Sequence, residues 1–364
     1  MVNPPRAAFA NIDPRIDYFE KAAETQNFGD YLPELFAKEL LRYPKIEADV
    51  FRLVGSVISE KWIRWDLARA NGKVSGLIAL WLCGARNETP LSDATRKHCL
   101  FFGVRGPRTR DLLKLPADTV LGDPGLLAPL FHKPAQHAAT AGKAICIPHI
   151  EDPKNEAELL ALSGAEAIVY PVVDSSEAGL REILDKIAGA EFVLSGSLHG
   201  AIIACAYGVP FAFWNTGHVD APFKWDDFAQ SVGIEARFAV NLTEGREIWN
   251  EHISVNSRPP SLAAMLDVCP FVVRPAKLIQ ALALDGTIDR EEAHRVALAL
   301  DRLDDSSLDT ARALIRRSAI HRDARESIVA VGSRRLRISL RRLARRASPK
   351  FVRETFRAIR LRGS

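Results

Sequence analysis

The histidine of the segment SGSLHG, His199, is the side chain that we single out for proton transfer. It interrupts a run of small and apolar residues that extends over 191–214. Imidazole exchanges a proton near neutral pH, and histidine is therefore the commonest general acid or base in enzymes. The Ser197 hydroxyl and the backbone amides at the start of the following helix, that of Gly200 among them, are suited to hold a phosphate. The segment predicts a site that moves protons beside an anionic ligand.

Three further polar residues are candidates for the same site. Arg105 is the first arginine after the apolar run CLFFGV, and its guanidinium fork matches a carboxylate or a phosphate. Asp30 stands at the start of a helical pattern, and His149 ends the run AICIPH. Each has a structural alternative: an arginine that faces water, as we expect for Arg108 and Arg110, a helix cap for Asp30, and loop packing for His149.

A strand followed by a helix must position His199. The run EFVL predicts a strand that ends near Ser195, and the small hydroxyl residue before Leu198 predicts a helix cap. Gly208 and Pro210 predict the end of this helix. In doubly wound α/β sheets, ligands bind outside the carboxyl ends of the strands, where helix N-termini attract anions. The same dipole disfavours imidazolium, so the sequence predicts a neutral histidine that can act as a base, unless a bound phosphate opposes this effect.

Strands and helices alternate in two regions, which predicts an α/β fold with parallel sheets. The first region holds the runs VFRLVGSVIS, VSGLIALWLCG and HCLFFGVRG, and the second holds KAICIPHI, EAIVYPVV, EFVLSGS and VPFAFW. We place an N-terminal domain at 1–135, a C-terminal domain at 136–275 and a helical extension at 276–364. The boundary is drawn in a stretch rich in Pro, Gly and Ala, and no strand is expected after Pro270.

Several other kinds of site are not predicted. His132 and His137 lie in the Ala-rich stretch without carboxylate or thiolate partners, so we expect solvated linker residues and no metal site. Asp123, in GDPG, is typical of a turn. The sequence has neither a Walker A loop nor a Gly-x-Gly-x-x-Gly fingerprint, and GSLHG lacks the spacing of a hydrolase nucleophile elbow. These patterns argue against nucleotide hydrolysis and dinucleotide redox chemistry.

Charge is distributed unevenly along the 364 residues. Residues 311–364 carry 17 Lys and Arg and 3 Asp and Glu, a net charge of +14, so the remainder carries −10 of the overall +4. Over 333–364, apolar residues recur at helical spacing among arginines, which predicts an amphipathic segment on an anionic membrane surface; packing on the acidic body is the alternative. Aromatic residues are sparse there, so no nucleic-acid partner is expected.

The sequence also predicts where in the cell the protein is located. No apolar run is long enough to span a membrane, and the N-terminal residues do not have the pattern of a secretory leader. The five cysteines are far apart, as in proteins of a reducing compartment. We therefore expect a cytoplasmic protein that is peripheral on the inner face of the cell membrane.

The order of residues around His199 resembles that of the polysaccharide pyruvyl transferase family. In that family a strand ends in a short turn, followed by Leu-His-Gly, an Ala-rich helix and Gly-x-Pro before the next strand. The run SGSLHGAIIACAYGVPF has the same order. NFGDYLPELF resembles the family's early Gly-Asp helix start, GVRGPRTRDLL its Val-Arg strand end and VLGDPGLL its Gly-Asp-Pro turn. The resemblance extends over about residues 25–230.

The resemblance implies two Rossmann-like domains as in the GT-B architecture, with the acceptor on the first and the donor on the second. It also implies transfer of pyruvate from phosphoenolpyruvate to two hydroxyls of a polysaccharide precursor, free or lipid-linked, giving a cyclic ketal without a cofactor or metal. On this basis His199 would transfer protons, Asp30 would orient an acceptor hydroxyl, Arg105 and Ser197 would hold the donor, and His149 would support them.

One position departs from the family. Several relatives carry an arginine two residues before the histidine, where it contacts phosphoenolpyruvate, and this chain has Ser197. A hydroxyl cannot replace a bidentate guanidinium, so either another cation serves or the donor differs. The alternatives are a GT-B glycosyltransferase that uses a nucleotide sugar and a non-catalytic, membrane-associated scaffold.

Overall fold

The computed structural model of the protein describes residues 13–19, 21, 23–70, 75–217 and 219–300. The residues that the structure describes divide into two compact units, one within 1–39 and 43–260 and the other within 40–42 and 261–364. Both parallel sheets belong to the first unit. The predicted α/β class with parallel sheets is confirmed.

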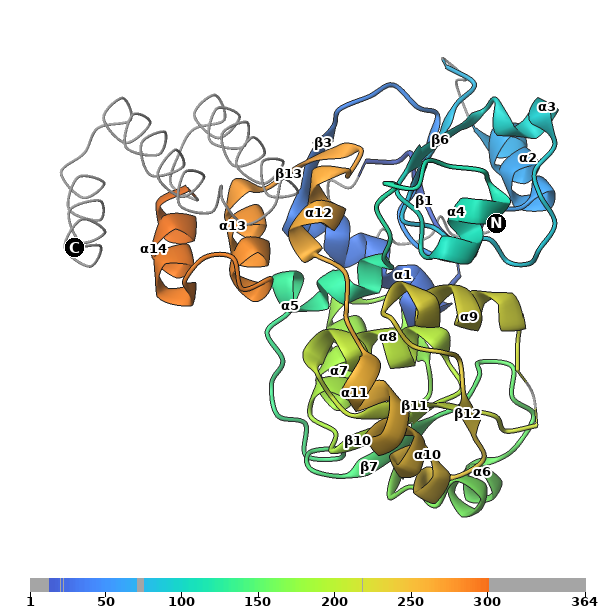
Figure 1. The fold of residues 1–364 in the computed structure, drawn as a ribbon, viewed down its shortest axis with the longest axis vertical. Helices are drawn as coiled ribbons and strands as arrows, with labels where there is room; N and C mark the ends of the chain where they lie inside the picture. The colour runs from blue at the N-terminus through green and yellow to red at the C-terminus, as the bar shows by residue number, and fades with distance from the viewer. Residues whose placement is uncertain (1–12, 20, 22, 71–74, 218, 301–364) are drawn as a thin grey trace. The chain divides into compact units, whose positions relative to one another are not determined.

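The first sheet has four parallel strands in the order β1-β4-β5-β6 (Figure 1). They are β1 (Ile16–Asp17), β4 (Val50–Arg52), β5 (Ile78–Trp81) and β6 (Cys99–Phe102). Every residue of β4 and β5 is buried, which is typical of parallel strands that are covered on both faces. The three strands predicted from the first region of the sequence are confirmed.

The second sheet has five parallel strands in the order β12-β11-β10-β7-β8. They are β7 (Ala144–Ile147), β8 (Ala167–Ile168), β10 (Phe192–Ser195), β11 (Phe211–Trp214) and β12 (Phe238–Ala239). Read from β8, the strands follow the doubly wound order second, first, third, fourth, fifth, so the direction of winding reverses between β7 and β10. Such sheets bind ligands at the carboxyl ends of the strands on either side of this reversal.

Helices connect the strands and extend the second unit. They are α1 (Phe28–Leu35), α2 (Glu60–Arg69), α3 (Asp93–Arg96), α4 (Pro107–Leu112), α5 (Ala128–Phe131), α6 (Glu156–Ser163), α7 (Glu177–Ala188), α8 (Leu198–Tyr207), α9 (Pro222–Ser231), α10 (Leu242–Ile248), α11 (Ser254–Asn256), α12 (Leu262–Asp267), α13 (Pro275–Leu284) and α14 (Arg290–Leu300). One 3₁₀ turn, Pro124–Leu127, and two π turns, Phe36–Leu40 and Trp249–Ile253, complete the described helical segments.

An antiparallel pair of strands attaches the N-terminal helix α1 to the second half of the first unit. β2 (Thr25–Asn27) pairs with β9 (Val172–Asp174), and the Phe28 N–H donates to the Pro171 carbonyl at 3.0 Å. As a result α1 packs against α7 and α8, beside which it lies in Figure 1. Residues separated by about 170 positions in the chain therefore become neighbours.

The expectation that no strand follows Pro270 is wrong. β13 (Phe271–Val273) is a buried strand of the second unit and pairs with β3 (Leu41–Pro44), and the Arg274 N–H donates to the Leu40 carbonyl at 2.9 Å. A strand forms here because the short run FVV combines an aromatic and two β-branched residues, and because a distant segment pairs with it.

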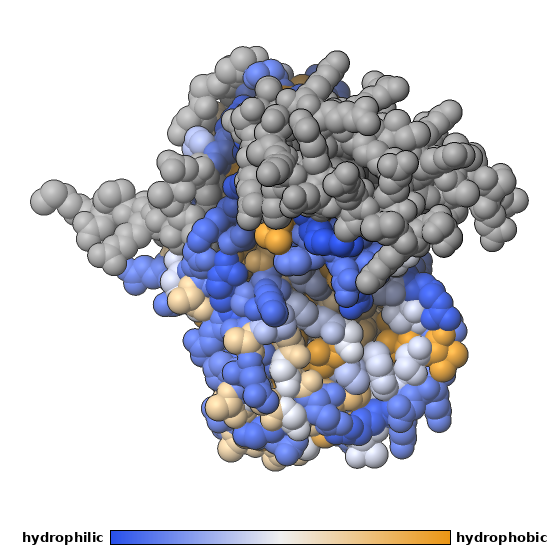
Figure 2. Space-filling view, turned by 90° about the vertical axis from the view of Figure 1, so that its left-hand side faces the viewer, coloured by the Kyte–Doolittle hydropathy of each residue, from blue (hydrophilic) through white to orange (hydrophobic). Residues whose placement is uncertain are grey.

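The surface shows no large apolar face in the view of Figure 2, where hydrophilic residues predominate on the described part and hydrophobic residues are scattered. Scattered apolar residues are ordinary on a protein surface. Among the described residues, no helix combines the length and the apolar character that crossing a membrane requires. The basic segment 333–364, with its predicted membrane contact, lies outside the described residues.

Candidate active site

The strand and helix predicted around His199 are confirmed. β10 ends at Ser195, α8 begins at Leu198, and Gly208 takes the left-handed conformation, with φ of 70°, at the end of the helix. Ser197 occupies the N-cap position, but its side chain makes no capping hydrogen bond, so that part of the expectation is wrong. The Ser195 hydroxyl donates to the Ser197 carbonyl at 2.7 Å and accepts from the Ser197 N–H at 3.3 Å, and thus holds the turn instead.

His199 is packed on several sides and its Nε2 atom is buried without a hydrogen-bond partner. The side chain is 12% exposed, and the ring meets that of Phe28 edge to face at a centroid distance of 6.4 Å. A Cβ atom added to Gly29 would lie 2.0 Å from His199 Nδ1, so α1 approaches the imidazole closely. A buried polar atom without a partner is uncommon in a folded protein and points to a ligand or a catalytic role.

Asp123 faces the same nitrogen. Its Oδ1 atom lies 3.8 Å from His199 Nε2, beyond ordinary hydrogen-bond distance but close enough for electrostatic interaction. The same oxygen accepts from the Gly125 N–H at 2.9 Å, which confirms the predicted turn role of Asp123. Sequence reasoning identified the turn and missed the position beside the histidine. A carboxylate at this side of the ring favours the tautomer that keeps the proton on Nε2.

A cavity of about 770 Å³ brings most of the predicted site residues together. Asp30, Arg105, His149, Ser197 and His199 all line it. The lining residues follow the carboxyl ends of strands from both sheets: β4, β5 and β6 in the first, and β7, β10 and β11 in the second. The cavity therefore includes the reversal between β7 and β10, where the doubly wound topology predicts a ligand.

Arg105 is buried and held by three hydrogen bonds. Its Nε donates to Asp227 Oδ2 at 3.2 Å, Nη1 to the Ser56 hydroxyl at 2.6 Å, and Nη2 to the Ala85 carbonyl at 2.9 Å. The side chain is 1% exposed, which excludes the alternative of an arginine that faces water. These contacts commit three of the five guanidinium N–H donors.

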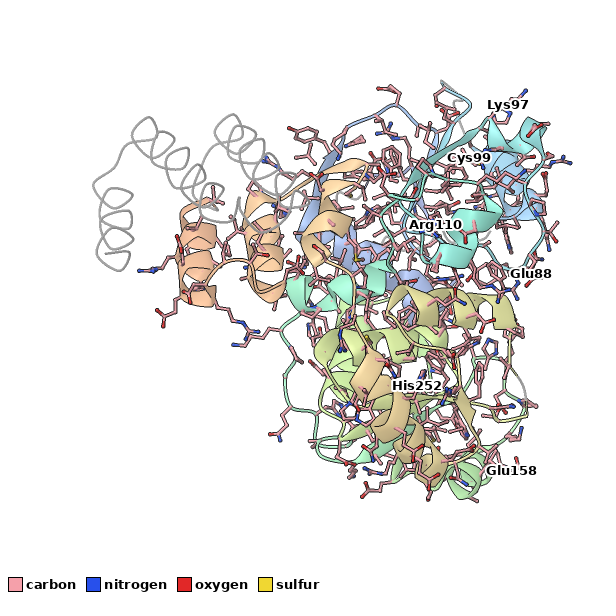
Figure 3. The ribbon with its side chains drawn as sticks, in the orientation of Figure 1. Glu88, Lys97, Cys99, Arg110, Glu158 and His252 are labelled. Carbon is pink, nitrogen blue, oxygen red and sulfur yellow. The ribbon has the colours of Figure 1, made fainter. Side chains whose placement is uncertain are left out.

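The two neighbouring arginines lie on α4 and pair with surface carboxylates. Arg108 contacts Glu88 and Asp226, and Arg110 pairs with Asp111 at 2.9 Å. Arg110 and Glu88 are both labelled in Figure 3. Neither arginine is among the residues that line the described cavity.

Asp30 belongs to the first turn of α1, but it is not the helix cap. The N-cap is Asn27, whose side chain accepts from the Gly29 N–H at 3.0 Å. The capping alternative for Asp30 is therefore wrong, because the helix begins three residues earlier than that alternative requires. Its carboxylate lines the cavity, and Oδ1 would be 3.4 Å from a Cβ atom added to Gly55.

His149 forms part of a charged cluster that the sequence did not indicate. Its Nδ1 accepts from the Glu151 N–H at 3.2 Å, and its Nε2 lies 3.7 Å from Asp220 Oδ2. Lys224 Nζ lies 2.5 Å from Asp220 Oδ2, and Arg86 Nη2 lies 2.9 Å from Asp220 Oδ1. His149, Asp220, Lys224 and Arg86 all line the cavity.

The pKa values of two groups in this cluster, Asp220 and Lys224, are shifted from their ordinary values. The contact with His149 and the positive charges of Lys224 and Arg86 hold the pKa of Asp220 well below its usual range, against the opposing effect of burial. Burial lowers the pKa of Lys224, although the Asp220 carboxylate opposes this change. Asp220 is thus a constant anion near neutral pH that holds two cations at the cavity wall. No spacing rule links residues 86, 149, 220 and 224, so the sequence carried no signal for the cluster.

Gly200, the remaining predicted site residue, does not line the cavity. It is buried in α8, and a Cβ atom added to it would lie 2.5 Å from the Ser195 hydroxyl and 2.9 Å from Ile147 Cδ1, so other side chains occupy the space beside it. The expectation of a solvated His132 is wrong: it is 7% exposed, and its Nε2 lies 2.7 Å from Asp185 Oδ1. His132 directly follows the helical segments at 124–131 and pairs with Asp185 of α7.

Two features of the titratable side chains remain, a buried histidine outside the cavity and the arrangement of possible metal ligands. His252, labelled in Figure 3, is buried and its Nε2 accepts from the Glu235 N–H at 3.0 Å, which explains this histidine structurally. In the described part of the chain, no group of three or more His, Cys, Asp and Glu side chains is arranged to hold a metal ion.

Comparison with known proteins finds similarity in the central part of the chain. Residues 84–216 match the family model described as polysaccharide pyruvyl transferase. The chain is also 39% identical over 57 residues to the succinoglycan biosynthesis protein ExoV of Rhizobium meliloti (strain 1021), an alignment that covers 16% of this chain and 18% of that protein. The chain thus spans less than a fifth of the relative that it matches, and no solved structure matches it. The matched region contains Arg105, His149 and His199, and over residues 84–216 this chain is similar to the polysaccharide pyruvyl transferase family, as the order of residues around His199 indicated.

Proposed function

We propose that this protein is an enzyme that transfers pyruvate from phosphoenolpyruvate to a pair of hydroxyls on a polysaccharide precursor, forming a cyclic ketal. The observation that carries the proposal is His199, which lies in the region matched by the family model and whose Nε2 is buried without a hydrogen-bond partner at the wall of the cavity. The same cavity holds cations for an anionic donor, and it extends past Asp30 toward the N-terminal segment that would receive the acceptor.

The cations of the cavity suit a donor that carries a carboxylate and a phosphate. Lys224 and Arg86 both pair with Asp220, and Arg105 contributes a guanidinium whose two remaining N–H donors can serve a ligand. We assign Lys224 and Arg86 to the role of the family arginine that Ser197 replaces. The Lys224 ammonium and the exposed Arg86 guanidinium can bind one phosphate together, and Asp220 holds both cations in place in the free protein.

The chemistry requires a proton to be delivered and two protons to be removed. Protonation of the methylene carbon of phosphoenolpyruvate makes the adjacent carbon electrophilic, and one acceptor hydroxyl adds there and loses its proton. The C–O bond to phosphate then breaks, the second hydroxyl adds to the same carbon and loses its proton, and inorganic phosphate is released. His199, with Asp123 beside Nε2, is the group that we assign to these proton transfers.

The finer features of the prediction belong to this proposal. They are a GT-B-like arrangement of two Rossmann-like domains, an acceptor that is free or lipid-linked, a location in the cytoplasm, and attachment of residues 333–364 to an anionic membrane surface. The absence of a cofactor or metal requirement is proposed with them. A lipid-linked acceptor would favour attachment of the enzyme to the membrane in which that acceptor is held.

The test uses donor binding and product formation together. The protein is titrated calorimetrically with phosphoenolpyruvate and, separately, with nucleotide sugars, and it is incubated with phosphoenolpyruvate and extracted lipid-linked oligosaccharide, with the mass of one pyruvate ketal as the readout. His199→Ala is expected to abolish product formation in a protein that remains folded, while His137→Ala, which removes a histidine outside the cavity, is expected to change neither product formation nor the melting temperature. Binding of a nucleotide sugar but not phosphoenolpyruvate would favour a glycosyltransferase instead, and binding of neither would favour the scaffold.

A further inference from the structure

An exposed group of aromatic side chains stands at the edge of the cavity. We call Phe19, Trp62 and Trp65 the aromatic shelf. Phe19 and Trp65 are 42% and 40% exposed. The rings meet edge to face, with centroids 5.7 Å apart for Phe19 and Trp62 and 5.4 Å apart for Trp62 and Trp65.

The shelf is continuous with the candidate active site. Phe19 and Trp62 line the same cavity as His199. The polar residues Glu60, Lys61 and Asn87 line the same cavity, and Lys61 Nζ lies 5.3 Å from the centroid of the Trp62 ring. The shelf therefore presents apolar ring surface among groups that donate and accept hydrogen bonds, which is the usual composition of a small-molecule site.

Helix α2 holds the two tryptophans in fixed positions. The helix is anchored by the buried Ile63 and by Asp66, which accepts from Arg52 Nε at 2.9 Å. The Arg69 guanidinium lies 4.1 Å from the centroid of the Trp65 ring and holds that ring by a cation–π contact. A partly exposed ring that is fixed in this way loses little conformational freedom when a ligand binds.

We propose that the aromatic shelf binds neutral hexose units of the saccharide acceptor, which rests on the proposed function. One face of a hexose ring carries mainly C–H groups, and an aromatic ring attracts such groups because its face is electron-rich. The equatorial hydroxyls of the sugar then meet the polar residues beside the shelf. Binding there would orient the chain so that its next residue enters the cavity toward His199. A lipid tail or a protein partner fits less well, since charged side chains adjoin the rings.

The experiment measures saccharide binding independently of turnover. Cellotetraose and galactotetraose serve as probes, and their dissociation constants are determined by calorimetry, with saturation-transfer NMR to identify the sugar protons in contact. The variants are Trp62→Leu, which keeps apolar volume but removes the ring, and Phe19→Ala, at an exposed position where folding is little affected. Tyr170→Ala is the matched control, since Tyr170 is a 44% exposed aromatic residue outside the cavity lining.

We expect at least one tetrasaccharide to bind the unaltered protein, and both shelf variants to weaken that binding about tenfold or more while the control leaves it unchanged. Phosphoenolpyruvate affinity should stay the same in all three variants. Absence of binding of either probe at millimolar concentration, or unchanged affinity in both shelf variants, would overturn the proposal. Saccharide binding that depends on the shelf in a protein that forms no ketal would refute the proposed function and leave the shelf assignment standing.

Discussion

Replacing Arg105 by lysine distinguishes a guanidinium that holds the fold from one that only binds donor. The arginine bonds Asp227, Ser56 and Ala85 through three different nitrogens. A lysine has one nitrogen on a stem of different shape, so it can keep at most one of these contacts in good geometry. Each buried group that loses its partner costs about 1–3 kcal/mol. The charge beside Asp227 is retained, and we therefore expect a loss of about 2–4 kcal/mol of unfolding free energy, a large part of the 5–15 kcal/mol typical of a domain.

The control is the same change three residues away. Arg108 pairs with Glu88 and Asp226 but its side chain is 29% exposed, so Arg108→Lys should cost less than about 1 kcal/mol. Urea unfolding of both variants gives the difference, provided that the m-value is unchanged. Phosphoenolpyruvate affinity, measured where Arg105→Lys remains folded, tests the donor role separately, and we expect it to fall. Equal stability of the two variants would refute the structural reasoning, and unchanged donor affinity would remove Arg105 from the binding site.

Three further predictions concern other parts of the chain. Gly29→Ala should reduce turnover at least tenfold and cost about 1–3 kcal/mol of stability, since the new methyl would lie 2.0 Å from His199 Nδ1; normal kinetics with an unchanged melting temperature would contradict the close approach. Burial lowers the pKa of Lys224 below the ordinary lysine value of about 10.4, so Lys224 loses its positive charge at a lower pH than an exposed lysine does. Phosphoenolpyruvate binding should therefore weaken as the pH rises through this range, and Lys224→Arg should abolish that weakening. Matching pH profiles for the two proteins would count against Lys224 as a donor ligand. Deletion of 333–364 should abolish salt-sensitive sedimentation with anionic vesicles, and equal sedimentation of the full and shortened chains would exclude membrane binding by this segment.

Local signals were sufficient for the elements that carry His199. The apolar run 192–195, the small residues of the turn and Gly208 fix the strand, the helix start and the helix end, because each effect acts within a few residues. The same reasoning located β4, β5 and β6 of the first sheet and β7, β8, β10 and β11 of the second, but it missed the two-residue edge strands β1 and β12. The motif order around His199 indicated the similarity to the family. Where local signals failed, a distant partner was involved. Residues 271–273 form a strand only by pairing with β3, and His132 is buried by contact with Asp185.

The surroundings of His199 were decided by tertiary structure. Asp123 approaches its Nε2 from one turn and Gly29 approaches its Nδ1 from the N-terminal helix. Lys224 reaches the cavity from α9, and Arg105 is fixed by Asp227, which lies 122 positions away in the chain. These contacts follow from the order of the strands and the packing of the helices. The free energy that fixes this arrangement comes from many residues that are distant in sequence, so no local pattern specifies which side chains meet. The residue type of His199 and its helix turn are therefore properties of the sequence, whereas its partners and the charge of its cavity are properties of the fold.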